Sequence, residues 1–382
     1  NQLISQTNIT NKSSKTNKTS QTNKSNKTSQ TSQIFPVTKI DVSISDDTIS
    51  LYNDGNGIDV SMHPEYNIWI PELIFGHLRT STNYDKSEKK IVGGKNGFGF
   101  KLVLIWSTWG QIETVDSKTG QKYIQTFKNN LDIIEPPIIT KSQSKPYTIV
   151  KFKPDFKRFG IDGLSDDFKS LILRRIYDIA AVTNKSVNVT FNSNKLKPEI
   201  KNFQNYIDLY IGSKTDTERV YEEANERWEY AVCLAPNDEF SQVSFVNGIF
   251  TSKGGKHVDY IMNQIIKKLT IYIKEKKHID VKPASIKEQL LIFVNSTIEN
   301  PAFDSQTKDY LNSAVSNFGS TCEVSSKFIE KIAKMGIMNI ACSLTELKEN
   351  KAKKKTDGNK SKNIRNIPKL VDANFVVIDI SI

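Results

Sequence analysis

Alternating apolar and polar residues predict two adjacent strands near the start of the folded part of the chain. The first, Lys39–Ser45, is apolar at every second position, and the second, Thr48–Tyr52, follows the turn Asp46-Asp47. Ser165 is a suitable N-cap for a long amphipathic helix that reaches Ala181. The same patterns predict a helix over Ile68–Arg79 and strands at Gln111–Val115, Lys122–Phe127 and Tyr147–Phe152.

A second series of elements begins near Arg227. Strands are predicted at Trp228–Ala235, Gln242–Ile249 and Leu291–Ser296, and a closing helix at Ser325–Leu347. Between them, apolar residues three or four positions apart mark one face of a long helix: Val258, Ile261, Ile265, Leu269 and Ile273. Strands in groups, with helices on one face, indicate an α+β fold.

These patterns divide the chain into five parts. Residues 1–33 are almost entirely Asn, Thr, Ser, Lys and Gln, and such a composition predicts a disordered tract because it buries too little apolar surface. Two folded domains are expected at 34–225 and 226–348. A basic linker, 349–366, and the start of a further region, 367–382, complete the division.

The net charge of +11 and the sequence pI near 9.2 come from two segments. Residues 1–33 hold five lysines and no acid, and residues 351–366 hold seven basic residues and one acid. The rest of the chain is close to neutral. A uniformly basic surface that coats nucleic acid is therefore excluded, and a role in DNA handling needs local features.

The cysteine count and the lengths of the apolar runs exclude other classes. Cys233, Cys322 and Cys342 are far apart, which supports neither a disulfide framework nor a zinc site, so a reducing intracellular compartment is expected. Apolar runs such as Leu290–Val294 are too short to span a bilayer. No signal peptide opens the chain, and residue 1 is Asn, so we expect a fragment or a processed piece.

The first candidate site is the segment 53–57, with the sequence Asn-Asp-Gly-Asn-Gly, directly after the second strand. Asn and Gly tolerate positive φ, so a tight turn is the simpler interpretation. The functional alternative is that a polar side chain at the strand end meets an adenine amino group while the glycines let a nucleotide approach the backbone.

The second candidate is the glycine-rich segment 93–101, which runs into an apolar helix start at Leu102–Trp106. Four glycines bare their amides, and Lys95 and Lys101 add positive charge, which suits a triphosphate. The segment lacks the Gly-Lys-Ser/Thr of a Walker A loop and the spacing of a Rossmann fingerprint. A mobile surface loop is the alternative.

Two further segments carry polar side chains, and each of these segments has a structural and a functional interpretation. Residues 80–85, Thr-Ser-Thr-Asn-Tyr-Asp, suit either helix capping or contacts to ribose and phosphate oxygens. Gln306, Thr307 and Lys308 follow a proline turn, where a lone lysine is usually just solvated.

In combination these segments resemble the ATPase region of type IIA (eukaryotic and viral) DNA topoisomerases. The resemblance covers roughly residues 35–374. It includes Tyr52–Ile58, Pro71–Gly76, Ser81–Asp85, Glu88–Gly99, Arg174–Ile179, Ser244–Asn247, Ser252–Tyr260, Glu299–Lys308 and Ile367–Leu370.

The resemblance implies a GHKL ATP-binding α/β sandwich followed by a transducer domain that is similar to ribosomal protein S5. It implies that Asn53 contacts the adenine end of ATP, and that Gln306 and Lys308 act as catalytic residues by reaching the γ-phosphate from the transducer, with Thr307 beside them. The ribose and phosphates would be held by Ser81, Thr82 and Asn83. The lid over the phosphates would be Gly94, Lys95, Asn96, Gly97, Phe98, Gly99, Phe100 and Lys101.

The resemblance also implies partners. ATP would close two copies of the chain into a homodimeric clamp around a double-stranded DNA segment. Lys274, Lys276 and Lys277 match a basic patch that would touch this duplex, although a solvated helix end that complements its dipole explains them equally well. The implied location is the nucleus, or the host cytoplasm or virion of a large DNA virus.

The sequence departs from the family pattern at both ends. The family's general base, a Glu, and the Asn that holds Mg²⁺ lie on a helix upstream of the first strand, and neither can be assigned in this chain. The TOPRIM domain and the cleavage tyrosine are absent, so they are expected elsewhere in the same chain or in a partner. Residues 375–382 do not follow the family. A non-catalytic module that binds nucleotide or DNA, from a split or decayed gene, is therefore the alternative function.

Overall fold

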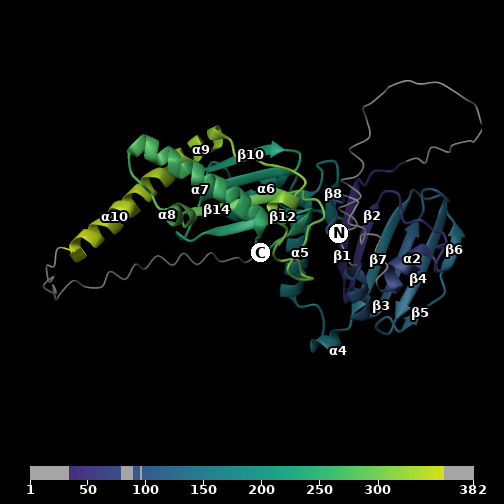
Figure 1. Ribbon diagram of the computed structural model, residues 1–382. Helices are drawn as coiled ribbons and strands as arrows, with labels where there is room; N and C mark the ends of the chain where they lie inside the picture. Colours follow the sequence, from purple (N-terminus) through teal and green to yellow (C-terminus); the bar gives the residue numbers. More distant parts are fainter. Residues whose placement is uncertain (1–33, 79–88, 95–96, 357–382) are drawn as a thin grey trace, which may run out of the picture.

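The strands form two sheets that lie side by side, with helix α5 (Asp166–Val182) between them (Figure 1). The structure is a computed structural model that describes residues 34–78, 89–94 and 97–356. Among these residues, no helix combines the length and the apolar character that crossing a membrane requires. The predicted segments 1–33 and 367–382 lie outside the described residues.

The first sheet has nine strands in the order β5-β4-β3-β7-β2-β1-β8-β9, with β6 paired to β4. Strands β1 and β2 are antiparallel neighbours, and β1 also pairs in parallel with β8. The strands are β1 (Lys39–Ser45), β2 (Thr48–Asp54), β3 (Ser107–Val115), β4 (Gln121–Lys128), β5 (Ile133–Ile134), β6 (Ile138–Lys141), β7 (Tyr147–Pro154), β8 (Asn188–Phe191) and β9 (Asn194–Lys195).

The second sheet has five strands in the order β10-β11-β14-β12-β13. Strands β12 and β14 are parallel, and the helix α7 makes the crossover between them. The strands are β10 (Arg219–Asn225), β11 (Trp228–Leu234), β12 (Ser241–Val246), β13 (Ile249–Phe250) and β14 (Leu290–Ser296).

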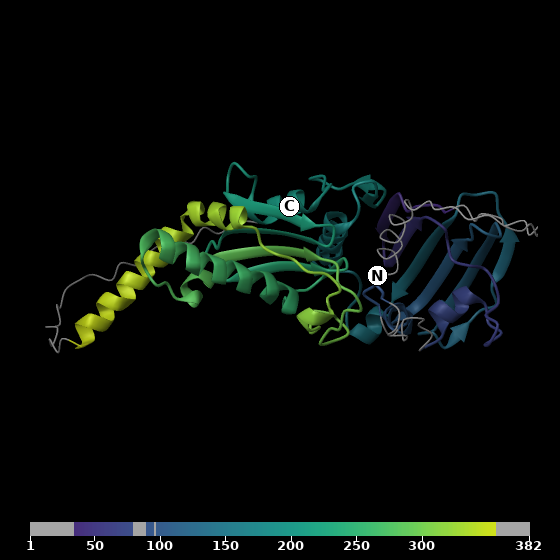
Figure 2. The same ribbon diagram turned by 45° about the horizontal axis from the view of Figure 1, so that its top comes forward.

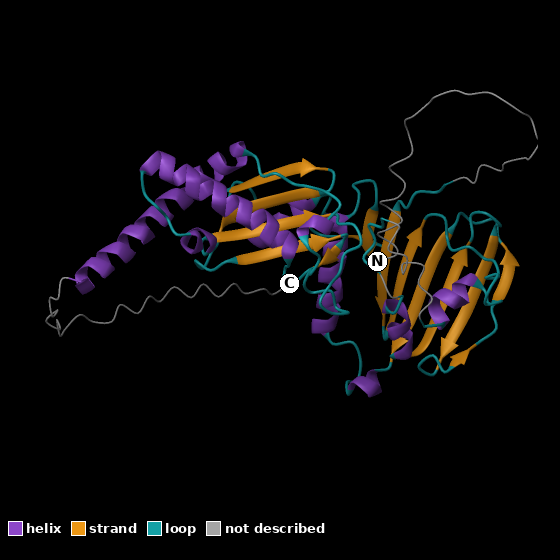
Figure 3. Cartoon of the chain, viewed as in Figure 1, coloured by secondary structure: helices purple, strands orange, loops and turns teal. Residues whose placement is uncertain are grey.

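The longer helices gather around the second sheet, whereas the short helices α2 and α3 accompany the first (Figure 3). Helix α10 projects from the second sheet, away from the first (Figure 2). The remaining helices are α2 (Ile70–Gly76), α3 (Gly99–Ile105), α4 (Phe156–Phe159), α6 (Phe203–Ile211), α7 (Lys256–Lys277), α8 (Pro283–Lys287), η1 (Val315–Asn317), α9 (Ser326–Ile332), η2 (Ala333–Ile337) and α10 (Met338–Thr356).

The second sheet is apolar on both faces, since successive side chains of a strand point to opposite sides. On β11, Tyr230 and Val232 face a core formed with α7 and α9, and Ala231 and Cys233 face α5 and α6. Helix α7 buries the five predicted apolar positions, Val258, Ile261, Ile265, Leu269 and Ile273. This prediction of one helix face is confirmed.

Helices α5 and α6 form a layer shared by both sheets. Their apolar side chains, such as Ile176 and Phe203, pack against β11, β12 and β14 of the second sheet. The same cluster includes Val42 of β1 and, partly buried, Leu51 of β2. A single apolar cluster therefore joins the two units. Ser165 caps α5 as predicted, because its hydroxyl accepts a hydrogen bond from the Phe168 amide at 3.2 Å.

Two predicted elements are interrupted in the structure. The predicted strand Gln242–Ile249 is a hairpin, because Asn247 and Gly248 take positive φ values of 51° and 75° and form its turn. The predicted helix Ser325–Leu347 is broken at Gly336, which has a φ of 104°. In both cases a residue that tolerates positive φ decides the local structure.

The predicted domain and linker limits also shift. Strand β10 pairs with β11, so the second sheet starts at Arg219, before the expected limit at residue 226. This strand is mostly polar and lies at the sheet edge, which gives it little apolar alternation. The predicted linker 349–366 begins as part of α10, which runs to Thr356, because Lys, Ala and Glu are strong helix formers.

The stability of the fold is expected to depend on pH through His257, which is completely buried at the start of α7. Burial lowers the pKa of His257 from 6.5 to about 3. Below pH 6.5 the unfolded chain binds more protons than the folded one, so stability falls as the pH falls from 6.5 towards 3. Between pH 7 and pH 5, this group removes about 2 kcal/mol from the free energy of unfolding.

Urea unfolding at these two pH values measures this effect. His257→Gln removes the titrating group, so its stability is expected to depend less on pH than that of the wild type. The control is His278→Asn, since His278 is exposed and its φ of 57° is one that Asn also adopts. An equal pH dependence of the wild type and His257→Gln would contradict this assignment.

Candidate functional site

Asn53 lies near the end of β2 in the middle of the first sheet, where its side chain is only 3% exposed. Its Cα pairs with that of Ile40 on β1 and that of Thr148 on β7. Its Nδ2 donates to the Asp54 carbonyl oxygen at 2.7 Å. The strand therefore holds the amide in one place among buried neighbours.

The residues after Asn53 anchor the loop. The Asp54 carboxylate accepts hydrogen bonds from the amides of Thr38 and Lys39 at 2.7 and 2.8 Å. The Asn56 side chain accepts one from the Phe35 amide at 2.7 Å. Asp54 and Asn56 thus hold the entry to β1, and the Asn53 side chain takes no part in these contacts.

Gly57 brings this loop against β3. Its φ is 70°, and a Cβ at this position would lie 1.9 Å from the Val115 carbonyl oxygen. Only glycine fits a backbone this close with a positive φ. The turn that the sequence predicts is therefore present, and its glycine is required by close packing.

Thr148 and Thr114 are site candidates that the sequence did not indicate. Their hydroxyls lie 3.0 Å apart, both are buried, and Thr148 is the register partner of Asn53. Thr114 also donates to the Tyr147 carbonyl at 2.9 Å and accepts from the Ile58 amide at 2.9 Å. Strand register places these residues together, and no sequence motif carries that signal.

The glycine-rich segment leads into α3, which begins at Gly99 after an N-cap at Phe98 that makes no side-chain capping bond. Lys101 is 2% exposed, and burial lowers the pKa of its ammonium group. The Phe100 ring packs edge-on against Phe75 at 5.1 Å between centroids. The side chain of Phe100 therefore belongs to the core, and only its backbone remains a candidate for phosphate contact.

The structure leaves several predicted contacts untested. Gly94 and Gly97 are half-buried, and Gly97 has a φ of 66°. Lys95 and Asn96, together with Ser81, Thr82 and Asn83, lie outside the described residues. Their roles at the ribose and phosphates stay predictions.

Gln306, Thr307 and Lys308 lie in a hairpin formed by residues 302–312. Paired backbone bonds close it: the Asn312 amide donates to the Ala302 carbonyl at 2.8 Å, and that of Asp304 donates to the Tyr310 carbonyl at 3.2 Å. Gln306 and Thr307 are exposed. Backbone hydrogen bonds within the hairpin therefore define the shape of the turn.

Lys308 combines a left-handed backbone conformation with a partly buried side chain. Its φ is 62°, and its amide donates to the Ser305 carbonyl at 3.2 Å. Its side chain is half-buried, and burial lowers the pKa of its ammonium group. A partly desolvated cation interacts strongly with an anion, so this lysine is suited to bind a phosphate.

Asp309 ties the hairpin to the segment before α7. Its carboxylate accepts from the Ser252 hydroxyl at 2.9 Å and its carbonyl accepts from the Lys253 amide at 2.9 Å. Leu311 then pairs with the backbone at Gly255, where a Cβ would lie 2.5 Å from the Leu311 nitrogen. The predicted motifs Ser252–Tyr260 and Glu299–Lys308 are therefore bonded to each other in the second unit.

The three predicted DNA-binding lysines lie in the last turn of α7 and are exposed. Lys274 forms an ion pair with Asp280 at 2.9 Å, and the Lys276 ammonium lies 6.0 Å from the centre of the Tyr272 ring. Lys277 makes no ion pair within the described residues. The three positive charges are therefore close together but not equivalent.

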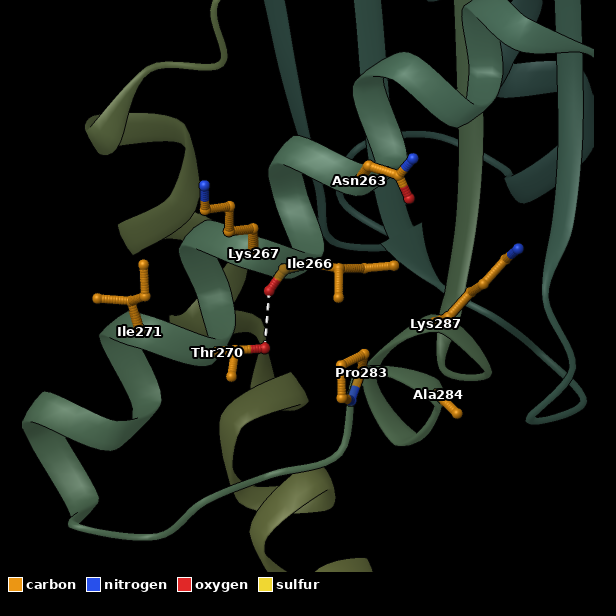
Figure 4. Close-up of a pocket in the computed structure, with 8 residues that line it drawn as sticks. All are labelled: Asn263, Ile266, Lys267, Thr270, Ile271, Pro283, Ala284 and Lys287. Atoms are coloured by element: carbon orange, nitrogen blue, oxygen red, sulfur yellow. Dashed lines mark hydrogen bonds between the residues drawn. The ribbon is translucent and has the colours of Figure 1, made fainter.

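A hollow of about 560 Å³ lies between α7 and α8, near this helix end (Figure 4). None of the predicted nucleotide contacts lines it. Its lining residues are Asn263, Ile266, Lys267, Thr270, Ile271, Pro283, Ala284 and Lys287.

The described residues contain no group of three or more His, Cys, Asp or Glu side chains that is arranged to hold a metal ion. Mg²⁺ prefers oxygen ligands in octahedral geometry and is often held through substrate phosphates. No Mg²⁺ ligand is therefore assigned to the side chains of the described residues.

Comparisons with known proteins give one consistent family. A family model described as DNA gyrase B matches residues 199–362. The DNA topoisomerase 2 of Candida glabrata is 44% identical over 88% of this chain and 25% of its own length. That of Acanthamoeba polyphaga mimivirus is 44% identical over 84% of this chain and 26% of its own. The chain thus spans about a quarter of these relatives.

A solved structure of the ATPase region of Saccharomyces cerevisiae topoisomerase II has the same fold. It is 45% identical, covers 81% of this chain and 80% of its own, and superposes with a TM-score of 0.76. The chain belongs to the DNA topoisomerase II family, within which it is similar to the ATPase region.

Proposed function

We propose that this chain is the ATP-binding clamp of a type II DNA topoisomerase and couples ATP to the passage of one duplex through another. The observation that carries this proposal is the pairing of two features in one chain. Asn53 lies in a buried position at a strand end, and a separate unit presents a partly desolvated Lys308 in a hairpin that is closed by backbone hydrogen bonds.

In this proposal, the Asn53 amide binds the adenine end, and Thr148 beside it completes the polar surface. The backbone of residues 94–101 lies along the phosphates, with Ser81, Thr82 and Asn83 at the ribose. Gln306 and Lys308 bind the γ-phosphate. Mg²⁺ would enter with the nucleotide and neutralise charge on the phosphate oxygens.

Lys308 makes the site sensitive to hydrolysis. A cation that contacts only the γ-phosphate gains this interaction with ATP and loses it with ADP. The nucleotide state would therefore change how the second unit is held, and two chains would close as a homodimer in the ATP state. The cleavage and TOPRIM domains would belong to the same chain or to a partner, inside the nucleus or a virus-infected cell.

The test measures nucleotide binding and association together. Calorimetry of the 382-residue chain with a non-hydrolysable ATP analogue and with ADP, both with Mg²⁺, gives affinity. Light scattering on the same samples gives the oligomeric state. We expect both nucleotides to bind and only the ATP analogue to produce a dimer. The proposal would be contradicted if neither the ATP analogue nor ADP bound to the chain.

Contact between α7 and duplex DNA is expected to depend on salt. The logarithm of the DNA-binding constant falls linearly with the logarithm of the salt concentration, and each phosphate that a lysine neutralises makes this fall steeper by about 0.9. Replacing Lys274, Lys276 and Lys277 with alanine is expected to lower the magnitude of this slope by about 2. Three lysines count as about two phosphate contacts because Lys274 already pairs with Asp280. Filter binding of a duplex across a salt series measures the slope.

The control replaces three exposed lysines elsewhere with alanine: Lys195, Lys197 and Lys201. These residues lie next to β9 and α6. An unchanged slope in the α7 variant, or an equal change in the control, would mean that the three lysines do not contact DNA and only form a solvated helix end.

A further inference from the structure

The base of the 302–312 hairpin is bonded to the segment that precedes the glycine-rich loop. The Asn300 amide donates to the Lys90 carbonyl at 2.8 Å, and the Lys90 amide donates to the Asn300 side-chain oxygen at 3.2 Å. Residues 90 and 300 belong to different units, so these bonds join the two parts of the proposed nucleotide site directly.

Glu299 adds a charged contact at the same place. One of its carboxylate oxygens lies 3.6 Å from the Lys89 ammonium, and the other accepts from the Arg227 guanidinium at 3.1 Å. The Glu299 side chain is 14% exposed and that of Lys89 is 78% exposed. The pair with Arg227 is therefore the better shielded of the two, and it fixes the carboxylate that faces Lys89.

The backbone around Glu299 is held from several sides. Its amide donates to the Phe318 carbonyl at 3.0 Å, and Arg227 also donates to the Gly319 carbonyl at 3.1 Å. A Cβ on Gly319, which has a φ of 70°, would lie 2.1 Å from the Glu299 carboxyl carbon. The carboxylate thus lies across a glycine that leaves room for it.

The segment between β14 and Glu299 is also held by hydrogen bonds. The Asn247 side chain donates to the Ile298 carbonyl at 2.8 Å and accepts from the Ile298 amide at 2.7 Å. The Asn247 turn belongs to the second sheet. The position of residues 298–300 is therefore set by the second sheet, while residues 299 and 300 bond to the first unit.

We propose that Glu299 is a positioning residue that, with Asn300, fastens the hairpin bearing Gln306 and Lys308 to Lys89 and Lys90 at the start of the glycine-rich segment. This inference rests on the proposed function, since it assigns a role within the same nucleotide site. Glu299 itself touches no nucleotide. It sets where Lys308 lies relative to the phosphates. A displacement of the hairpin would therefore also displace Lys89 and Lys90, and the reverse.

The first test needs no nucleotide. Glu299→Gln keeps the shape of the side chain but removes its charge, and charged hydrogen bonds are about twice as strong as neutral ones. We expect hydrogen exchange at the amides of Lys90 and Asn300 to become about tenfold faster, a larger rise than at other protected amides. The melting temperature is expected to fall by a few degrees, because Arg227 loses its charged partner. The control is Glu323→Gln, since Glu323 also pairs with a lysine, Lys268, but is 87% exposed and does not contact the first unit.

The second test separates positioning from a purely structural role. In the wild type, the ATP analogue and not ADP is expected to slow exchange of the hairpin amides at Asp304, Tyr310 and Asn312. Glu299→Gln is expected to lose this difference between the nucleotides while its affinity for ADP stays within about twofold of the wild type. A general loosening would change both nucleotide states equally.

Lys89→Ala keeps the test valid if Glu299→Gln unfolds. Because Lys89 is exposed, its loss cannot disturb the core, and we expect a rise of about two- to fivefold at the same two amides. Unchanged exchange in both variants would overturn the positioning role. Failure of the wild type to bind nucleotide would overturn the proposed function, while faster exchange in Glu299→Gln would still identify the contact.

Discussion

Lys308→Ala is expected to abolish closure of the dimer by ATP while leaving the binding of ADP nearly unchanged. Lys308 is half-buried and partly desolvated, so its interaction with an anion is stronger than that of a surface lysine. Removing one such charged contact typically costs about 1.5 to 3 kcal/mol, which is a factor of about 10 to 150. Closure depends on this contact, whereas ADP has no γ-phosphate to offer it.

Chemical crosslinking of the 382-residue chain, with the ATP analogue or with ADP, measures this loss. We expect the closed fraction of Lys308→Ala with the ATP analogue to fall about tenfold, to the level that the wild type shows with ADP. Lys253→Ala is the control, since Lys253 also lies beside the hairpin but is bonded through its backbone amide. Wild-type closure by Lys308→Ala would remove the assigned role of Lys308.

Gly57→Ala is expected to lower the free energy of unfolding by about 3 kcal/mol or more. Two effects add at this position. A φ of 70° costs a residue with a side chain about 1 kcal/mol or more, and a Cβ only 1.9 Å from the Val115 carbonyl forces the backbone apart. Because Asn53 is four residues away, the displaced loop would also weaken nucleotide binding.

Two matched glycines separate these effects. Gly160 has a φ of 71° with open space around it, so Gly160→Ala is expected to cost only about 1 kcal/mol. Gly163 has neither a positive φ nor a neighbour within 4 Å, so Gly163→Ala is expected to change stability by less than about 0.5 kcal/mol. Urea unfolding of the three variants measures the order, and equal losses at Gly57 and Gly160 would exclude the steric part.

Periodicity predicted the elements whose apolar positions face one core. The bounds of strand β1 agree with their prediction, and so does the apolar face of α7, because apolar side chains recur there with the period of a strand or of a helix. Periodicity failed where local backbone geometry decides the structure, as at Gly336, or where a strand is mostly polar, as in β10.

The site was predictable where a motif is continuous in sequence. The loop at Asn53 and the glycine-rich segment were candidates from their own residues, whereas the segment at Lys308 became one only through the family resemblance. Thr148 and the bonds between Lys90 and Asn300 were not predicted, because strand register and contacts between distant segments bring these residues together. The glycine-rich motif also does not show that the Phe100 side chain turns into the core, which leaves the backbone of Phe100 as the candidate for phosphate contact.

The layer formed by α5 and α6 has a consequence for any attempt to isolate one half of this protein. Both sheets use the same apolar cluster, with Val42 on one side and Phe245 and Phe293 on the other. A cut after α6 would strip the second sheet of its cover and expose an aggregation-prone surface. A cut before α5 would leave both helices with the second sheet and would uncover the first sheet at Val42. The movement that the proposed function requires would keep this cluster covered if the packed surfaces slide by small steps, as in a shear mechanism, because a hinge that opened them would expose the cluster to water.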